Sequence, residues 1–212
     1  MENPVIIFGA NALGRTAKEI FESNEVVVYG FLDDNKKLHS TLLDEITVLG
    51  ATDDDGFLKL IGKKCEAFVA IDDNKLRKNL IKMLHDIRHV QPVNATHKQT
   101  IFSQSATIGH GNLFDAGFTA GAGSIIGHHN IFHAMSFIGA EAQVGDFIQV
   151  GAGSIINPGV VVENEVFIGA GSVIVSGITI GKGARVGAGS VVVSPVKAGA
   201  TVFGNPALGV KG

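Results

Sequence analysis

Apolar side chains recur at every sixth position along the second half of the chain. Counting in both directions from Ile168, an aliphatic, phenylalanine or alanine residue stands at each sixth position from Phe102 to Val192. The period holds without insertion from 102 to 191, which is 90 residues or 15 hexads. The residue four places after each of these anchors is usually small or aliphatic, and glycine often follows the anchor directly. A period of six fits neither a helix nor the simple alternation of a strand.

The hexads predict a parallel β-helix, in which each short strand ends at a corner. We expect the anchor and the fourth residue to point inward, and glycine to adopt corner angles that side chains oppose. Each coil buries its apolar row against the coils above and below, so the unit is stable as a stack. A β-sandwich would instead need turns at irregular spacings of roughly 8 to 12 residues. Five phenylalanines are expected to fill the core of the early coils: Phe102, Phe114, Phe118, Phe132 and Phe137.

The first ~100 residues lack this period and are expected to form a separate domain, with boundaries at 1–95 and 96–212. Strand patterns at 4–8, 25–31 and 66–71 alternate with helical patterns at 15–23 and 74–87, and a short helix is expected after Thr52. This alternation predicts a small parallel α/β layer. Such sheets bind ligands at the carboxyl ends of their strands. The loop 9–14, Asp33, Asp34, Asp72 and Asp73 fall at those ends.

The loop from Gly9 to Thr16 leads from a strand into a helix. It lacks the dinucleotide fingerprint because Asn11 stands where the second glycine is needed, and it differs from a P-loop because Arg15 replaces the lysine. Its amides still offer donors to a phosphate at a helix N-terminus. The alternative is a tight turn that serves only the fold. Asp33 and Asp34 could accept hydrogen bonds from a ribose or a base, or could be solvated residues at a strand end.

Composition narrows the possible functions. A net charge of -3, 7% aromatic residues and no Trp argue against a nucleic-acid surface. No apolar run reaches the ~18 residues that a membrane span needs. Cys65 is the single cysteine, so no disulfide framework is expected, and this residue is interpreted as packing rather than as a nucleophile. The start MENPVIIFG lacks the pattern of a secretory signal peptide, and a cytoplasmic location is expected.

Several segments resemble, in order and spacing, the bacterial hexapeptide-repeat sugar acyltransferases: IIFGANALGR, FLDD, VLGATDD, VAIDDN-KLR, the hexads and AGATVFGNPA. This group includes sialic-acid O-acetyltransferase-like proteins and N-acetyltransferases of UDP-linked 4-amino sugars. The resemblance implies a Rossmann-like domain that holds a nucleotide-sugar and a β-helix of left-handed sense. It also implies a homotrimer with acetyl-CoA in the groove between neighbouring chains.

The resemblance also shows departures at the expected catalytic positions. Acetyl transfer to an amine or hydroxyl needs a group that takes a proton, usually His near neutral pH. In the family, a catalytic His and an acidic residue stand shortly before a Gly-Asp pair. The Gly-Asp pair matches Gly145-Asp146 of this chain, so the family's His corresponds to Ala140 and its acidic residue to Glu141. A second family His corresponds to Gln149. A glycine-glycine-histidine loop near the sugar pyrophosphate corresponds to Asn11, Ala12 and Leu13, and a loop glycine corresponds to Asp72.

Two interpretations follow. In the first, the chain acetylates a nucleotide-linked amino sugar for a surface glycan, and the catalytic base has moved to another residue. The candidates are His133, seven residues before Ala140 and expected to face the same groove, and Glu141, if burial raises its pKa. In the second, it is a non-catalytic homologue that binds a nucleotide-sugar or CoA. The positions that match the family's CoA groove are Gln149, Ala170 and Ala188; the Gly-Ala-Gly triplets around the last two would also suit a plain β-helix corner.

Three polar residues repeat at the length of one coil. His110, His128 and Asp146 each lie two residues past an anchor and 18 residues apart, so we expect them to stack on one face, away from Ala140. A structural or trimer-packing role is the preferred interpretation. The spacing of these residues and His129 matches no zinc pattern, and no metal site is predicted.

Overall fold

The computed structural model describes residues 3–209 and divides into two compact units between Lys98 and Gln99. The first unit contains three helices, α1 (Ala12–Ser23), α2 (Asp55–Leu58) and α3 (Asn74–Arg88). Its strands are β1 (Val5–Phe8), β2 (Val28–Leu32), β3 (Leu42–Leu43), β4 (Ile46–Gly50), β5 (Glu66–Val69) and β6 (Ala95–Thr96). No helix among residues 3–209 combines the length and apolar character needed to cross a lipid bilayer.

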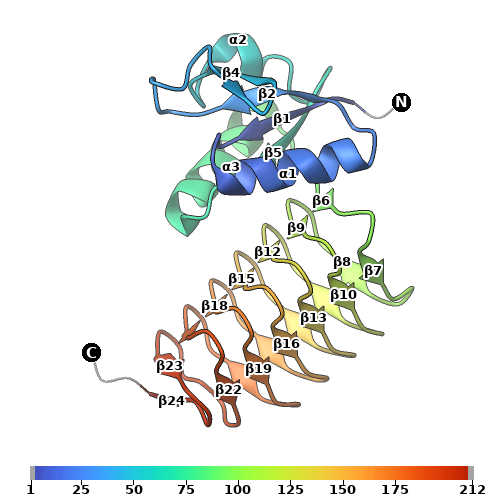
Figure 1. Ribbon diagram of the computed structural model, residues 1–212, viewed down its shortest axis with the longest axis vertical. Coiled ribbons are helices and arrows are strands. Elements are labelled where there is room, and N and C mark those ends of the chain that lie inside the picture. Colours follow the sequence, from blue (N-terminus) through green and yellow to red (C-terminus); the bar gives the residue numbers. More distant parts are fainter. Residues whose placement is uncertain (1–2, 210–212) are drawn as a thin grey trace. The chain divides into compact units, whose positions relative to one another are not determined.

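The sheet of the first unit has the order β3-β4-β2-β1-β5 (Figure 1). Strand β1 is parallel to both β2 and β5, and β2 is parallel to β4. The Rossmann-like layer is therefore confirmed. The three predicted strands are parallel, and the structure adds a hairpin at one edge, where β3 pairs antiparallel with β4. The sequence analysis missed this hairpin because its strands are short and its turn residues, Asp44 and Glu45, replace the usual glycine.

The core of this unit follows from apolar strands and helix faces. All four residues of β1 are fully buried. Helix α1 begins three residues earlier than predicted because the Asn11 side chain accepts a hydrogen bond from the Gly14 N–H at 3.0 Å, which caps the helix. Asp54 and Asp73 cap α2 and α3 in the same way. The caps place the first turns of α1 and α3 directly after β1 and β5.

The second unit is a parallel β-helix built from three rows of short strands, most of them two residues long (Figure 1). The first row contains β7 (Ile101–Phe102), β10 (Thr119–Ala120), β13 (Phe137–Ile138), β16 (Ile155–Ile156), β19 (Val173–Ile174) and β22 (Val191–Val192). The second contains β8 (Thr107–Ile108), β11 (Ile125–Ile126), β14 (Gln143–Val144), β17 (Val161–Val162) and β20 (Thr179–Ile180). The third contains β9 (Leu113–Phe114), β12 (Ile131–Phe132), β15 (Gln149–Val150), β18 (Phe167–Ile168), β21 (Arg185–Val186) and β23 (Thr201–Phe203), with β24 (Leu208–Gly209) antiparallel to β23.

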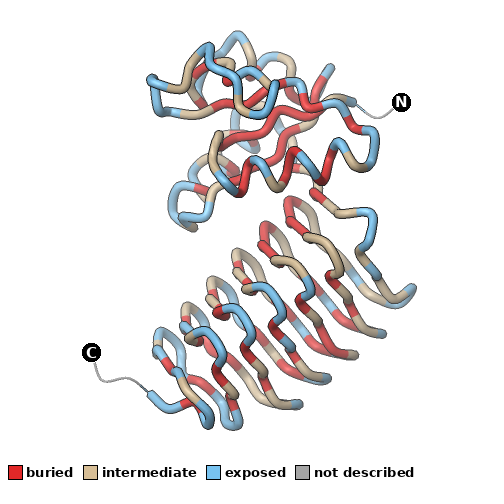
Figure 2. Tube along the Cα trace, viewed as in Figure 1, coloured by how far each residue is buried: buried red, intermediate tan, exposed pale blue. Residues whose placement is uncertain are grey.

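The predicted left-handed β-helix and its register are confirmed. Each strand pairs with the strand one coil away, as Ile126 does with Val144. Anchor residues form one continuous core through the stack, and buried stretches recur along every coil (Figure 2). The rings of Phe114 and Phe132 stack with their centroids 5.3 Å apart. Phe137 was wrongly assigned to the core: it precedes an anchor, so its side chain lies on the outer face and is half-buried.

Candidate functional site

The first candidate site lies at the carboxyl ends of β1 and β5. Asn11 not only caps α1 but also donates its side-chain amide to the carbonyl oxygen of Ala70 at 3.0 Å, which joins the two strand ends. Gly9 has a φ of +113°, and a Cβ there would lie 2.5 Å from the same carbonyl oxygen, so a side chain is excluded. Of the other predicted loop residues, Ala12 is exposed and Leu13 is packed into the core. The loop is therefore a rigid turn that presents backbone and the face around Ala12.

The predicted carboxylates Asp33 and Asp34 hold neighbouring loops in place. The Asp33 carboxylate accepts hydrogen bonds from the N–H groups of Ala10 and Asn35, both at 2.8 Å. Asp34 accepts from the N–H of Thr52 at 2.9 Å and from its hydroxyl at 2.8 Å. Asp33 thus lies beside the loop after β1, whereas Asp34 is directed toward the loop after β4. Their assignment to substrate binding stays a prediction.

The strand order singles out one position at this edge. It runs from β1 outward to β2 and β4 on one side and to β5 on the other, so the order reverses between β1 and β5. Ligands of open α/β sheets bind in a crevice at such switch points, and this candidate ligand site is called the β1–β5 crevice. The loop after β1 lies on one side of it, and residues 70–74, with Asp72 and Asp73, lie on the other. Arg77 of α3 donates to the carbonyl oxygen of Ile71 in this second loop. The sequence analysis did not single out Arg77, although an arginine on the apolar stripe of a helix was a visible signal.

The second candidate site lies in the β-helix at the corner between β13 and β14. Ala140 is half-buried there and Glu141 is exposed. The Glu141 N–H donates to the carbonyl of Ala122 at 2.8 Å, which fixes the backbone of this corner. Because Glu141 is exposed, a single chain does not itself provide the buried setting that a carboxylate base would need.

His133 lies at the preceding corner, between β12 and β13. Its N–H donates to Val150 at 3.0 Å and its carbonyl accepts from the hydroxyl of Ser136 at 2.7 Å, so its backbone is well fixed. Ala140 and His133 therefore occupy successive corners of one coil. That they face one groove stays a prediction.

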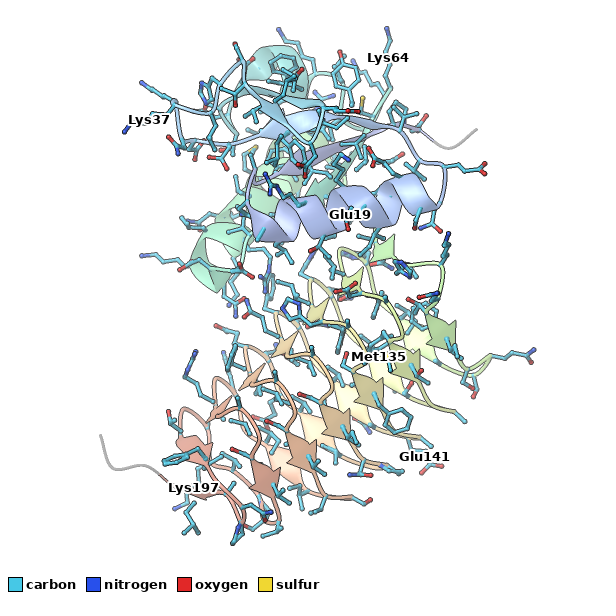
Figure 3. The ribbon with its side chains drawn as sticks, viewed as in Figure 1. Glu19, Lys37, Lys64, Met135, Glu141 and Lys197 are labelled. Carbon is cyan, nitrogen blue, oxygen red and sulfur yellow. The ribbon has the colours of Figure 1, made fainter. Side chains whose placement is uncertain are left out.

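The coil that carries these residues also carries backbone strain. Met135 and Glu141 have φ values of 60° and 58°, in the left-handed region that favours glycine. Figure 3 labels both side chains on the β-helix. At the corresponding corners of later coils this region is occupied by glycine, at Gly153, Gly171 and Gly189 for Met135 and at Gly159 and Gly177 for Glu141. His129, Phe147 and Glu165 adopt the same region at the third corner of three successive coils, so the strain extends over several coils and does not by itself select one.

The positions expected to bind CoA lie along the third row of strands. Gln149 is half-buried on the outer face of β15, beside Phe167 in the next coil. Ala170 and Ala188 are exposed at corners. A Cβ at Gly169 would lie 2.5 Å from the amide nitrogen of Ala188, so the first glycine of the triplet is required by coil stacking.

The last glycine of each triplet has a different environment. A Cβ at Gly153, Gly171 or Gly189 would meet nothing within 4 Å, which leaves a smooth strip beside the exposed alanines. Near it, the guanidinium of Arg185 lies 4.6 Å from the centre of the Phe167 ring. The strip is compatible with an extended ligand, and the assignment of CoA to it stays a prediction.

The polar column of His110, His128 and Asp146 stacks as predicted. The His110 N–H donates to Nδ1 of His128 at 3.1 Å, and the His128 N–H donates to Asp146 at 2.7 Å. The column continues, since the Asp146 N–H donates to Asn164 at 2.9 Å. Burial lowers the pKa of His110, and His128 acts in the same direction while Asp146 opposes them. The side chains of His128, Asp146 and Asn164 each accept a hydrogen bond from a corner amide of the preceding coil, whereas Nδ1 of His110 is buried without a partner among the described residues. These bonds support the structural role that the sequence analysis preferred.

A groove of about 440 Å³ lies on the second row of strands. It belongs to a face of the β-helix different from the one that carries Gln149. Apolar and polar side chains line it: Ile125, Gln143, Val144, Gly145, Val161, Val162, Glu163, Asn164 and Lys182.

Comparisons with known proteins match both units. Residues 4–84 match the PglD N-terminal domain, and residues 159–194 match the bacterial transferase hexapeptide family of six repeats. The chain resembles the bacterial hexapeptide-repeat sugar acyltransferases. The first match includes the switch point between β1 and β5, and the second includes Ala170 and Ala188 but not the coil that carries Ala140. A search of curated proteins gave no significant match.

Solved structures share the whole architecture. One is a mutant of GDP-perosamine N-acetyltransferase from Caulobacter crescentus, with a histidine replaced by alanine, in complex with CoA and GDP-perosamine. It is 28% identical to this chain, with a TM-score of 0.90, and the match covers 100% of this chain and 99% of that one. WeeI from Acinetobacter baumannii is 26% identical with a TM-score of 0.87, covering 98% of this chain and 99% of that one. The acetyltransferase domain of PglB from Neisseria gonorrhoeae, in complex with acetyl coenzyme A, shares the fold at 21% identity and a TM-score of 0.87, covering 99% and 100% of the two chains.

Proposed function

We propose that the chain transfers an acetyl group from acetyl-CoA to the amino group of a nucleotide-linked sugar used in surface glycan synthesis. The observation that carries this proposal is the match of both domains, over the full chain, to a nucleotide-sugar N-acetyltransferase in complex with CoA and its sugar substrate. The nucleotide-sugar is assigned to the crevice between β1 and β5, near Asn11, Ala12, Asp33 and Asp34. Acetyl-CoA is assigned to the strip along Gln149, Ala170 and Ala188.

In the reaction, the sugar nitrogen attacks the acetyl carbonyl carbon. A C–N bond forms and the C–S bond of the thioester breaks. The proton that the amine gives up leaves with a base, and the thiolate of CoA takes up a proton as it departs. The protein holds the amine and the thioester together, an effect that contributes several kcal/mol in comparable reactions.

Ala140 cannot accept the proton, so another group must. We assign this role to His133, which lies one corner before Ala140 in the same coil and would face the same groove. Glu141 is the other candidate if the neighbouring copy covers it. Without any base the rate would fall by about 10²- to 10⁴-fold, which an amine tolerates better than a hydroxyl. The missing histidine therefore favours N- over O-acetylation.

The proposal includes a homotrimer. The candidate residues His133 and Glu141 lie at different corners of one coil, and a neighbouring copy would complete the groove around them. The exposed apolar residues on the outer faces of the β-helix, among them Ile101, Ile125 and Ile155, are suited to be covered by neighbouring copies. We assign the protein to the cytoplasm, in keeping with the single cysteine and the use of acetyl-CoA.

Ala140 also favours a second candidate function, in which the chain binds its ligands without turnover. The Caulobacter mutant retains both CoA and GDP-perosamine after a histidine-to-alanine change. An alanine at position 140 is therefore compatible with a binding protein that has lost its base.

One experiment separates the two functions. The purified protein is incubated with labelled acetyl-CoA and a panel of UDP-, GDP- and dTDP-linked amino sugars, beside the Ala140→His and His133→Ala variants. Turnover by the native chain that disappears in His133→Ala supports the relocated base. Activity that appears only in Ala140→His supports the binding protein. If no variant transfers the label and none binds CoA, the acetyltransferase proposal is wrong.

A further inference from the structure

Arg77 is a buried charge on an otherwise apolar helix face. It lies on the inner stripe of α3 together with Ile81 and Leu84, and it is only 1% exposed. Burial lowers its pKa to about 10, while Asp72 and Asp73 act in the opposite direction. A buried guanidinium is costly to desolvate, and a leucine would continue the stripe without that cost. Departures from the local pattern of this kind are expected where function requires them.

The guanidinium is used to hold the loop after β5. Nη1 donates to the carbonyl oxygen of Ile71 at 2.5 Å and lies 3.4 Å from that of Asp72. Nη2 donates to the side-chain oxygen of Asn74. These acceptors all belong to residues 71–74, and two of them are main-chain oxygens. Because the planar guanidinium donates to several acceptors at once, Arg77 fixes the backbone of residues 71–74.

This loop contacts the loop after β1 from the other side of the crevice. The Asn11 amide reaches Ala70, the residue that precedes the loop. A Cβ at Gly9 would lie 2.9 Å from the Cδ1 of Ile71, so the two loops are in contact. The crevice at the topological switch point thus has two walls, and each is fixed by hydrogen bonds to the other or to α3.

We propose that Arg77 is a positioning residue for nucleotide-sugar binding, which holds residues 71–74 as the second wall of the crevice between β1 and β5. This inference rests on the proposed function, since it assigns the nucleoside diphosphate portion of the substrate to that crevice. The N-terminal turn of α1 follows β1 at this edge, and its free main-chain N–H groups would complement the diphosphate charge. The N-terminus of α3 is already capped by the Asp73 carboxylate. Arg77 itself does not touch the ligand. It holds the loop in one conformation before binding, so the loop loses less conformational entropy when the ligand binds.

The test uses the full chain with Arg77→Leu, which continues the apolar stripe, and Arg77→Lys, which keeps a charge but not the fork of donors. Ile81→Leu on the same stripe is the matched control. Binding of UDP, GDP, dTDP and CoA is measured by calorimetry, and amide hydrogen exchange is measured for residues 9–14 and 70–74. In Arg77→Leu we expect faster exchange in both loops and about tenfold weaker binding of whichever nucleoside diphosphate the native chain binds. CoA affinity is expected to stay within twofold, with Arg77→Lys intermediate.

Three results would overturn the inference. Unchanged exchange at residues 70–74 in Arg77→Leu would show that Arg77 does not hold the loop, whatever the ligand. Equal loss of nucleotide and CoA binding would show a general structural role. If Arg77→Leu does not fold, Arg77→Lys provides both measurements. A native chain that binds CoA but none of the three nucleotides would instead defeat the assignment of the crevice, and the inference with it.

Discussion

The imidazole of His128 accepts, through Nδ1, a hydrogen bond from the backbone N–H of His110 one coil away. This bond requires Nδ1 to be unprotonated, so the hydrogen sits on Nε2 in the neutral ring. The two rings lie 4.0 Å apart, and burial and His128 both disfavour a charge on His110. The neutral form of His110 is thus favoured in the first coil of the β-helix.

This pair predicts a loss of stability at mildly acidic pH. The folded-state pKa of His110 lies below its unfolded value of about 6.5, so below that pH the unfolded chain binds more protons. The free energy of unfolding should therefore fall as the pH drops from about 6.5 toward the lower pKa of folded His110. Above about pH 6.5, His110 should not affect the free energy of unfolding. Urea unfolding at pH 7.5, 6.5 and 5.5 measures the change. His110→Gln should reduce the pH dependence, and His85→Gln, at an exposed site, should not. Equal slopes in all three proteins would contradict the prediction.

Asn11 predicts a stability effect larger than that of an ordinary helix cap. Asn11→Ala removes both the cap of α1 and the bond to Ala70. We expect a loss of about 1 to 3 kcal/mol in the free energy of unfolding, since a cap and a partly buried hydrogen bond disappear together. Urea titration measures it. Asn35→Ala is the control because its side chain accepts only at an exposed turn, from Lys37 at 3.2 Å. Similar losses in both variants would argue against the connection between β1 and β5.

The strained corners predict opposite effects on stability and activity. Met135→Gly removes a side chain from the left-handed region and should raise the free energy of unfolding by up to about 1 kcal/mol. If the strain serves function, acetyl transfer should decrease in the same variant. Gly153→Ala, one coil away, should lower stability by about 1 kcal/mol through backbone strain, because its Cβ would meet no other atoms. Met135→Gly that is both more stable and fully active would show that the corner has no functional role.

Cys65 predicts slow reaction with thiol reagents in the folded state. The residue is 2% exposed, and burial together with Glu66 raises the pKa of its thiol. The thiolate is the reactive form, so labelling should be far slower in buffer than in 6 M guanidinium chloride. Labelling followed by mass spectrometry tests this. Comparable rates in the two solvents would be inconsistent with a packing role.

The sequence by itself determined the β-helix, because the six-residue period repeats a local requirement: one inward side chain for each short strand and one backbone reversal for each corner. The same reasoning located the polar column, since residues one coil apart in sequence must be neighbours in space. It erred at Phe137, where knowledge of the anchor position already implied an outward side chain.

Only the tertiary structure decided how distant segments meet. Asn11 reaches Ala70 and Arg77 holds residues 71–74, and neither contact follows from spacing along the chain. His133 and Ala140 looked close in sequence but lie at successive corners, because a coil turns between them. Local sequence patterns specify local geometry. A binding site depends on which strand ends become neighbours, and the packing of the whole sheet determines which ones do.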